Sequence, residues 1–187
     1  GVCRVLFVGT FIPLHGIQTI LHAIELLRYD KKIQFTIIGN GQDGKYVKEY
    51  IDRYPKHIKW VNTWQSATQI TNYIESSDVC LGVFGQGDKT QRVCPYKLYH
   101  YMVCGRAIIT ADTDWTRLVF QRNLAVPFET VQAGDGDLLA KKIKELSGDE
   151  DKRKALASSS SSFYKDNLSN KIALTELIKI LGFEHVL

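Results

Sequence analysis

Two patterns of hydrophobic residues alternate along this chain of 187 residues, one typical of strands and one typical of helices. Short runs of apolar and β-branched residues, such as Val5-Leu-Phe-Val8, are typical of strands that are covered on both faces. Between these runs, apolar residues recur at the spacing of the buried side of a helix. The predicted strands are residues 4–8, 33–38, 58–61, 79–83, 107–110 and 124–127.

The helical stretches follow the strands one by one. The first has apolar residues at Ile17, Ile20, Leu21, Ile24 and Leu27, which form one face of a helix. Alternating strands and helices define the α/β class. We therefore predict a Rossmann-like parallel sheet of about six strands, with helices on both faces and a helical C-terminal tail. Further helices are predicted near 43–54, 66–77, 97–104, 114–120 and 136–146, from about 150, and at 170–181. At this length, residues 1–187 form a single domain, either a whole protein or half of a bilobed one.

Several loops are expected to meet at one edge of this sheet. Right-handed crossovers place the C-terminal ends of parallel strands along the same edge. Ligands of such sheets bind beyond those ends, where the strand order reverses. Gly9-Thr10, Gly39-Asn-Gly41, the residues after Val61 and the long polar loop 85–96 all follow predicted strands. We therefore expect these four segments to converge on a ligand site.

The most informative segment is 92–110, which contains a basic loop, a short helix and a buried strand. Pro95 suits the start of the helix, because its missing N–H would be unpaired there, and Gly105 suits the end. Free N–H groups and the dipole at a helix N-terminus attract anions. The basic residues of the preceding loop therefore indicate a phosphorylated ligand.

Three cations, Lys89, Arg92 and Lys97, lie in this loop or at the start of its helix. Together they could neutralise the charge that develops on a leaving diphosphate. A solvated basic loop is the alternative and is common. The loop is longer than a usual connection, which favours a function.

Two glycine segments offer further phosphate contacts. Between Gly9 and Gly16, glycine lets backbone N–H groups approach a pyrophosphate, and His15 could contact its oxygens; an ordinary strand–helix turn is the alternative. Gly39-Asn-Gly41 could present amides in the same way, although we interpret it as a tight turn. Neither segment has the Gly-x-Gly-x-x-Gly spacing of nicotinamide enzymes, so a dehydrogenase is not supported.

Other polar side chains near these loops have competing interpretations. His100 lies one turn into the helix, where it could reach the site or pack beside its tyrosine neighbours. Cys94 is flanked by cations, so a nucleophilic thiol with a lowered pKa is a hypothesis, which we disfavour because no partner histidine has a readable position. Asp112 and Asp114 follow the fifth strand, and we expect one of them to cap the next helix.

Composition and charge exclude several classes. The net charge of +4 is mild and spread along the chain, which favours an anionic ligand but lacks the clustered basic face of a nucleic-acid binder. The apolar runs are too short to span a bilayer. The four cysteines have no metal-ligand spacing. We expect a cytoplasmic protein without a nucleic-acid partner.

These motifs, taken in order, resemble one known family. The matching pieces are Val5-Leu-Phe-Val-Gly9 with His15-Gly16, Phe35-Thr-Ile-Ile-Gly39-Asn-Gly41, Asp78-Val-Cys-Leu-Gly82, and the segment from Arg92 to Thr110. Over nearly the whole chain they resemble the C-terminal, donor-binding domain of retaining glycosyltransferases with the GT-B fold, of the group 1 or family 4 type. In that family this domain binds the nucleotide sugar, and an N-terminal domain binds the acceptor.

The resemblance implies a hexosyltransferase that moves a sugar from a nucleoside diphosphate to a polysaccharide or glycoconjugate acceptor with retained anomeric configuration. It implies no cofactor and no metal, because cations of the donor domain hold the diphosphate. The residues that it places at the diphosphate are Gly9, Thr10, His15, Gly16, Lys89, Arg92 and Lys97. Those that it places at the nucleoside are Gly39, Val61, Asn62 and His100. It assigns no catalytic residue.

Three positions depart from the family pattern. The family commonly has lysine where His15 stands. It also has two glutamates, the second on the donor ribose, where this chain has Arg92 and His100. A catalytically degenerate nucleotide-sugar-binding or regulatory module is therefore one alternative function. Another doubly wound sugar-nucleotide enzyme, such as an epimerase, is a second.

The same resemblance implies partners. The acceptor-binding domain is not part of residues 1–187, so we expect it in cis or as a separate subunit. We expect the isolated chain to be inactive without it. Peripheral association with the inner face of the membrane could come through that missing half.

Overall fold

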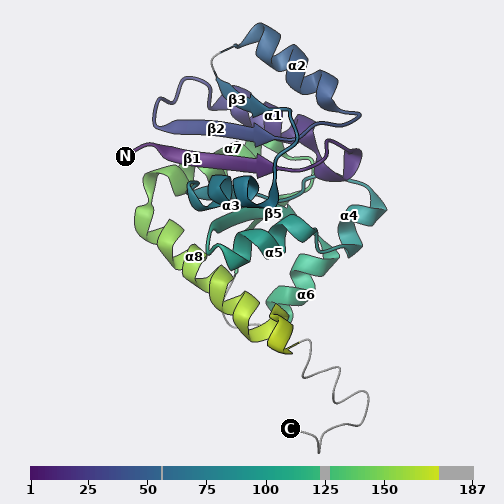
Figure 1. Ribbon diagram of the computed structural model, residues 1–187, viewed down its shortest axis with the longest axis vertical. Coiled ribbons are helices and arrows are strands. Elements are labelled where there is room, and N and C mark those ends of the chain that lie inside the picture. Colours follow the sequence, from purple (N-terminus) through teal and green to yellow (C-terminus); the bar gives the residue numbers. More distant parts are fainter. Residues whose placement is uncertain (56, 123–126, 173–187) are drawn as a thin grey trace, which may run out of the picture.

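A six-stranded parallel sheet forms the centre of the protein, in a computed structural model that describes residues 1–55, 57–122 and 127–172. The order across the sheet is β3-β2-β1-β4-β5-β6, and every neighbouring pair is parallel. The predicted α/β class and Rossmann-like sheet are confirmed (Figure 1). The strands are β1 (Cys3–Val8), β2 (Ile33–Ile38), β3 (Ile58–Val61), β4 (Val79–Leu81), β5 (Ala107–Asp112) and β6 (Glu129–Gln132).

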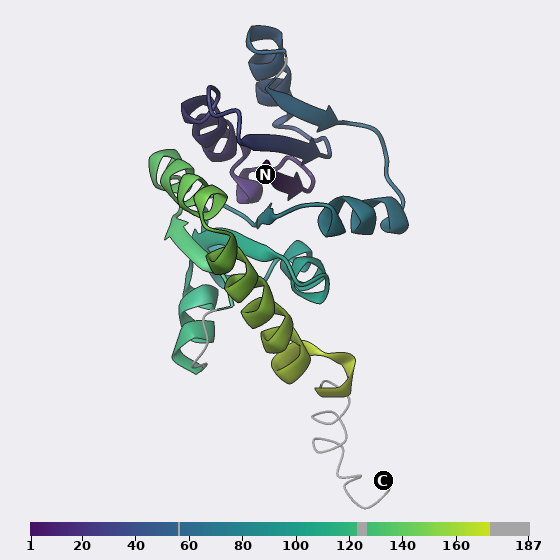
Figure 2. The same cartoon turned by 90° about the vertical axis from the view of Figure 1, so that its left-hand side faces the viewer.

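Helices connect the strands and cover both faces of the sheet. On one face, α1 (Ile17–Leu26) and α7 (Gly136–Gly148) lie side by side, and on the other lie α3 (Ala67–Glu75) and α5 (Tyr96–Val103) (Figure 2). The remaining helices of the described residues are α2 (Gly44–Arg53), α4 (Asp88–Arg92), α6 (Asp114–Arg122) and α8 (Glu150–Phe163), which continues into the wider turn Tyr164–Leu168.

Two hydrophobic clusters fill the space between the sheet and its helices. Alternate residues of β1 divide between them: Val5 and Phe7 belong to the cluster with α1, α2 and α7, and Leu6 belongs to the cluster with α3 and α5. Successive strand residues point to opposite faces, so β1 contributes to both clusters. A strand of this kind has no polar face, which is why it appears in the sequence as an unbroken apolar run.

The sixth strand is shifted from its predicted place at 124–127. Residues 123–126 lie outside the described part of the chain, and the strand is Glu129–Gln132 instead. These residues pair in register with the end of β5. Pro127 has no N–H to donate to that ladder, so the pairing begins after it.

The helical C-terminal tail is confirmed by α7 and α8. Asp149 caps α8 by accepting a hydrogen bond from the N–H of Lys152. This helix passes from one hydrophobic cluster to the other, because Leu156 belongs to the first and Phe163 to the second. The last predicted helix, 170–181, lies mostly outside the described residues.

The strand order reverses between β1 and β4, and the loops that follow these two strands are tied together. The N–H of Phe84 donates to the carbonyl of His15 at 3.2 Å, and the N–H of Gly85 donates to the carbonyl of Leu14 at 3.1 Å. Crevices at such reversal points are the usual ligand sites of doubly wound sheets. The expected convergence of loops at the C-terminal edge is therefore present.

Candidate functional site

A cavity of about 440 Å³ opens at this reversal point. Its walls come from the end of β1, the loop after it, α3, and the segment that runs from α4 into α5. Apolar side chains supply much of the lining, so its few polar groups decide what binds. The predicted site residues that line it are Gly9, Thr10, His15, Lys89, Lys97 and His100.

Lys97 enters this cavity from the first turn of α5. Its Nζ is buried, has no hydrogen-bond partner among the described residues, and lies 4.1 Å from the centre of the Phe7 ring. Burial lowers the pKa of Lys97 well below its ordinary value. A buried amine without a partner costs free energy, of which the aromatic ring offsets only part. The arrangement suits an anion that would supply the missing acceptors.

The absence of a side chain at Gly9 leaves room for Lys97 Nζ. A Cβ atom at Gly9 would lie 2.6 Å from Lys97 Nζ and 2.9 Å from Cε1 of His15. The two side chains therefore meet over a backbone position that only glycine leaves open. The sequence predicts that Gly9 allows another group to approach the backbone closely, and the structure fits this. The groups that approach it in the structure are the side chains of Lys97 and His15.

His15 ends the short 3-10 turn Pro13–His15 and packs edge-on against Phe7, with ring centres 5.8 Å apart. Its Nδ1 is hydrogen-bonded to the carbonyl of Thr10, which can only accept, so Nδ1 carries the proton. Burial, and then the charge of Lys97, lower the pKa of His15 to about 4. His15 is thus neutral near neutral pH, with a lone pair on Nε2, and it would need a second proton to donate to a phosphate.

Gly16 ends this turn and packs against the backbone of the loop after β4. It adopts a φ of 64°, a left-handed conformation that favours glycine. A Cβ there would lie 2.5 Å from the backbone carbonyl carbon of Phe84. Gly16 therefore lets the loops after β1 and β4 touch, and it acts on the cavity by positioning His15.

His100 lies one turn further along α5 and contacts α3. Its Nε2 is 2.9 Å from the hydroxyl of Thr71, which also donates to the carbonyl of Ala67 at 3.0 Å. Burial lowers the pKa of His100. The imidazole is therefore neutral, and it bridges the two helices that flank the cavity.

Other predicted site residues lie beside the cavity rather than in its lining. Arg92 is exposed at the end of α4. Gly39, with a φ of 128°, packs so closely on the loop after β1 that a Cβ would lie 2.0 Å from the carbonyl oxygen of Gly9. The interpretation of this glycine loop as a tight turn fits that packing. The role of Gly39 and Arg92 in binding stays a prediction.

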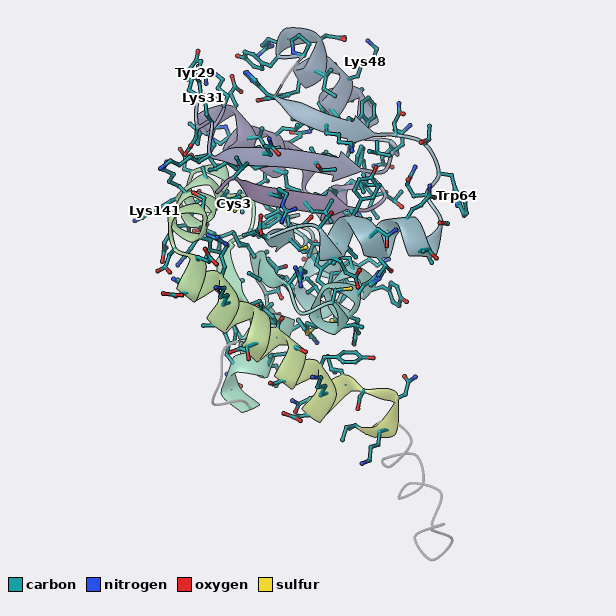
Figure 3. All side chains as sticks on the ribbon, turned by 60° about the vertical axis from the view of Figure 1, so that its left-hand side comes forward. Cys3, Tyr29, Lys31, Lys48, Trp64 and Lys141 are labelled. Carbon is teal, nitrogen blue, oxygen red and sulfur yellow. The ribbon has the colours of Figure 1, made fainter. Side chains whose placement is uncertain are left out.

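The predicted base-binding residues are the last residue of β3, Val61, and the residue after it, Asn62. The carbonyl of Val61 accepts a hydrogen bond from the N–H of Gly39 at 2.9 Å, and Asn62 is exposed. The same loop carries Trp64, which is 85% exposed and stands away from the body of the protein beyond β3 (Figure 3). An exposed loop at this edge is open to a ligand that extends past the cavity, and its role in binding stays a prediction.

Burial raises the pKa of the Cys94 thiol to about 12, which agrees with our interpretation that Cys94 is not an activated nucleophile. The expectation that an aspartate caps α6 is wrong. Asp112 and Asp114 both pair with Arg117, at 3.1 and 3.0 Å. The cap of α6 is Thr113 instead, whose hydroxyl accepts from the N–H of Thr116 at 3.2 Å.

Sequence reasoning missed several residues of the site. Phe7 was assigned only to a strand, and Thr71 only to a helix, yet one lies against Lys97 and the other binds His100. Neither has a local signal, because both contacts join segments that are far apart along the chain. The apolar lining that was also missed comes from Val8, Leu14, Ile70, Ile74 and Val93.

The described residues show no group of three His, Cys, Asp or Glu side chains that could hold a metal ion. In the same part of the chain, none of the helices has the length and apolar character needed to cross a bilayer.

A doubly wound sheet with a largely apolar cavity at its reversal point is an architecture in which small ligands commonly bind. The sequence model of one family, Glycosyl transferases group 1, matches residues 3–149. The chain therefore belongs to the group 1 glycosyltransferases, and its fold is that of a C-terminal domain of this family. The predicted resemblance is confirmed.

Solved structures share this fold. The chain is similar to the C-terminal domain of LpcC, a glycosyl transferase group 1 family protein from Francisella tularensis, with 14% identity and a TM-score of 0.74 over 90% of this chain and 87% of that one. It is also similar to HepE of Anabaena solved with UDP-glucose (16% identity, TM-score 0.76, 97% of this chain and 49% of HepE). A third match is the pneumococcal O-GlcNAc transferase GtfA solved with UDP and GlcNAc (16%, 0.73, 97% and 36%).

At these identities the likeness shows the fold alone. The chain spans about half the length of HepE and a smaller share of GtfA. No curated protein sequence matches it.

Proposed function

We propose that this chain holds the nucleoside-diphosphate sugar of a retaining glycosyltransferase whose acceptor-binding domain lies outside residues 1–187. The observation that carries the proposal is Lys97, whose buried Nζ has no partner among the described residues and lines the cavity at the reversal point. A diphosphate would supply the acceptors that this nitrogen lacks. Its negative charge would also raise the pKa of Lys97 and so favour the ammonium form.

The other polar groups of the cavity would act on the same ligand. His15 would take up a proton on Nε2 and donate to a phosphate oxygen, with Nδ1 held by Thr10. Lys89, at the end of the cavity formed by α4, would add positive charge. Charge grows on the diphosphate as the glycosidic bond breaks, so cations fixed at that place stabilise the transition state more than the ground state. These cations are proposed to do this without a metal.

The donor and acceptor follow from the comparisons by analogy. Structures of HepE and GtfA contain UDP, which makes UDP-sugars the first candidates. We propose a polysaccharide or glycoconjugate acceptor that is bound by an N-terminal domain, in cis or as a separate subunit. The reaction would take place in the cytoplasm, with peripheral membrane contact through that domain, and residues 1–187 alone would be inactive.

A catalytically degenerate binding module is the second candidate function. It is favoured by Arg92, which is exposed and outside the cavity lining, and by the neutral His100. Both functions require nucleotide binding. Donor hydrolysis or sugar transfer by the complete protein distinguishes them, because a degenerate module would bind the donor and leave it intact.

The binding step is tested by calorimetric titration of the chain with UDP, GDP and ADP, for the wild type and Lys97→Met. Lys141→Met is the matched control, because Lys141 is exposed on α7 and points into solvent (Figure 3). We expect one diphosphate to bind, its affinity to fall at least about tenfold in Lys97→Met, and Lys141→Met to behave as wild type. Failure of all three nucleotides to bind the folded chain, or equal affinity in wild type and Lys97→Met, would overturn the proposal.

A further inference from the structure

A second cavity, of about 580 Å³, lies at the opposite edge of the sheet from the cavity that contains Lys97. It is lined by the first residues of β2 and β3, the end of α1 and the loops that lead into both strands. Its volume is that of a small-molecule site. The donor-binding function proposed above does not use it.

Arg28 contributes an unpaired donor to the wall of this cavity. Its Nη1 donates to the carbonyl of Glu25 at 2.8 Å, but its Nε is buried and has no hydrogen-bond partner among the described residues. An arginine side chain stays protonated in proteins, so Nε always carries a hydrogen that needs an acceptor. Nε and Nη2 together form the planar fork that binds two oxygens of a phosphate or carboxylate.

His57 contributes a second unpaired nitrogen, from the loop before β3. Its Nδ1 is also buried and without a partner in the described part of the chain. The Tyr54 ring lies between the two side chains: it stacks on His57 with ring centres 5.5 Å apart, and the guanidinium carbon of Arg28 is 5.8 Å from its centre. Buried polar atoms are rarely left unpaired, and sites for ions or ligands are among the exceptions.

Tyr29 lies over the Arg28 guanidinium, with 4.4 Å between the ring centre and the guanidinium carbon. Its side chain is 78% exposed, and it stands beside Lys31 at the N-terminal end of β2 (Figure 3). Exposed side chains change rotamer rapidly. The Tyr29 ring can therefore turn away and open the guanidinium to a ligand.

The charge of the lining favours an anion. Its charged side chains are Arg28, Asp30, Lys31 and Lys59. Both oxygens of Asp30 are already occupied, one by the side chain of Lys144 and one by the N–H of Lys32. Three cations therefore remain for a ligand. The apolar part of the lining is formed by Ile24, Leu27, Ile33, Phe35 and Ile58, which suits an anion that carries an organic group.

We propose that this cavity binds a phosphate monoester, with Nε and Nη2 of Arg28 donating to two phosphate oxygens and with Lys31, Lys59 and His57 around the phosphate. The organic group of the ester would lie against the apolar part of the lining. A phosphate monoester carries about two negative charges at pH 7, so it matches three cations better than a carboxylate does. The ester is either a soluble metabolite or the headgroup of a lipid.

The site is tested by NMR titration with glycerol 3-phosphate at constant ionic strength, in wild type, Arg28→Met and Arg53→Met. Arg53 is the matched control, because its guanidinium carbon is 6.0 Å from the centre of the same Tyr54 ring but the residue is exposed and outside the cavity lining. We expect saturable shifts of the Arg28 Nε–H signal, which the Arg28→Met spectrum identifies. Affinity should fall at least about tenfold in Arg28→Met and stay unchanged in Arg53→Met.

Two further variants keep the test independent of the folding of Arg28→Met. Arg28→Lys keeps the charge and loses the fork, so it should recover only part of the affinity. Lys59→Met changes an exposed residue away from the Tyr54 ring and should lower the affinity roughly threefold, the worth of one exposed charge.

Sedimentation with phosphatidylcholine vesicles, with and without phosphatidic acid, distinguishes the two sources of the ester. Binding of glycerol 3-phosphate alone indicates a soluble metabolite, and added binding to the phosphatidic acid vesicles, weakened in Arg28→Met, indicates a lipid headgroup. Both results support the proposed site.

Three results would overturn it: shifts confined to residues around Lys97, equal shifts with sodium chloride in place of the ester, or equal affinity in wild type and Arg28→Met. The Lys97→Met variant should bind glycerol 3-phosphate at this cavity as the wild type does. The outcome is therefore independent of the proposed donor site.

Discussion

Lys97 Nζ lies 4.1 Å from the centre of the Phe7 ring, buried and without a hydrogen-bond partner among the described residues. One residue comes from α5 and the other from β1, on opposite sides of the reversal point. The contact places a basic nitrogen over an aromatic face in an apolar wall, where it should weaken the fold and would favour a bound anion. Function and stability should therefore oppose each other at this position.

Replacing Lys97 by methionine should stabilise the ligand-free chain. Methionine keeps the apolar stem of the side chain and removes the unpaired nitrogen, so we expect a gain of about 1–3 kcal/mol in the free energy of unfolding. Urea denaturation measures this gain. Lys141→Met, on the exposed face of α7, should change stability by no more than about 0.5 kcal/mol. A Lys97→Met variant less stable than wild type would show that the nitrogen is satisfied in the free protein.

Gly9→Ala should weaken nucleotide binding more than it weakens the fold. The new Cβ would lie 2.6 Å from Lys97 Nζ, the end of a flexible side chain that can move aside. We expect affinity for UDP to fall about tenfold while the urea midpoint changes little. Gly39→Ala is the contrasting variant, because its Cβ would meet a backbone oxygen at 2.0 Å and its φ is 128°. It should lose more than about 1 kcal/mol of stability; equal stability losses in the two variants would contradict this account.

Nucleotide binding should be accompanied by proton uptake at His15. Its pKa is about 4 in the free chain, and a phosphate at Nε2 would raise it. Affinity for UDP should therefore increase as the pH falls from about 8 towards 6. Calorimetry in buffers with different ionisation enthalpies counts the protons, and His15→Gln should take up fewer of them. Identical uptake in wild type and His15→Gln would place His15 outside the binding reaction.

The same histidine should make the folded chain sensitive to acid. Its folded-state pKa, about 4, lies below the ordinary value of 6.5. Between these values the unfolded chain binds the proton and the folded chain does not, so stability falls as the pH falls. Thermal unfolding at about pH 7 and pH 5 should show a larger drop for wild type than for His15→Gln. Parallel drops would mean that other groups account for the acid sensitivity.

Much of the fold could be predicted from the sequence because its strands are buried on both faces. The unbroken apolar run of β1 and the glycine that follows it are typical of a buried parallel strand in an α/β protein. The sixth strand was placed too early, because apolar residues before Pro127 resemble a strand as well as Glu129–Gln132 does. Periodicity alone does not separate two such neighbours.

The site was predictable only in outline. Cations that follow parallel strands must gather at one edge, so Lys97 and His15 could be placed there from the sequence. The burial of Lys97 could not, because it depends on the packing of Phe7. The orientation of His100 depends in the same way on Thr71, which belongs to a different helix.

The most direct test of the account follows Lys97 itself through a titration. The ¹³Cε chemical shift of a lysine reports whether its nitrogen is an amine or an ammonium, and the signal absent from Lys97→Met identifies the residue. In the free chain we expect a pKa well below the ordinary lysine value, as burial dictates. Saturation with UDP should raise that pKa towards the ordinary lysine value, the effect of a diphosphate in contact. An unchanged pKa in the UDP-bound chain would show that the diphosphate lies elsewhere and would contradict the proposed donor site.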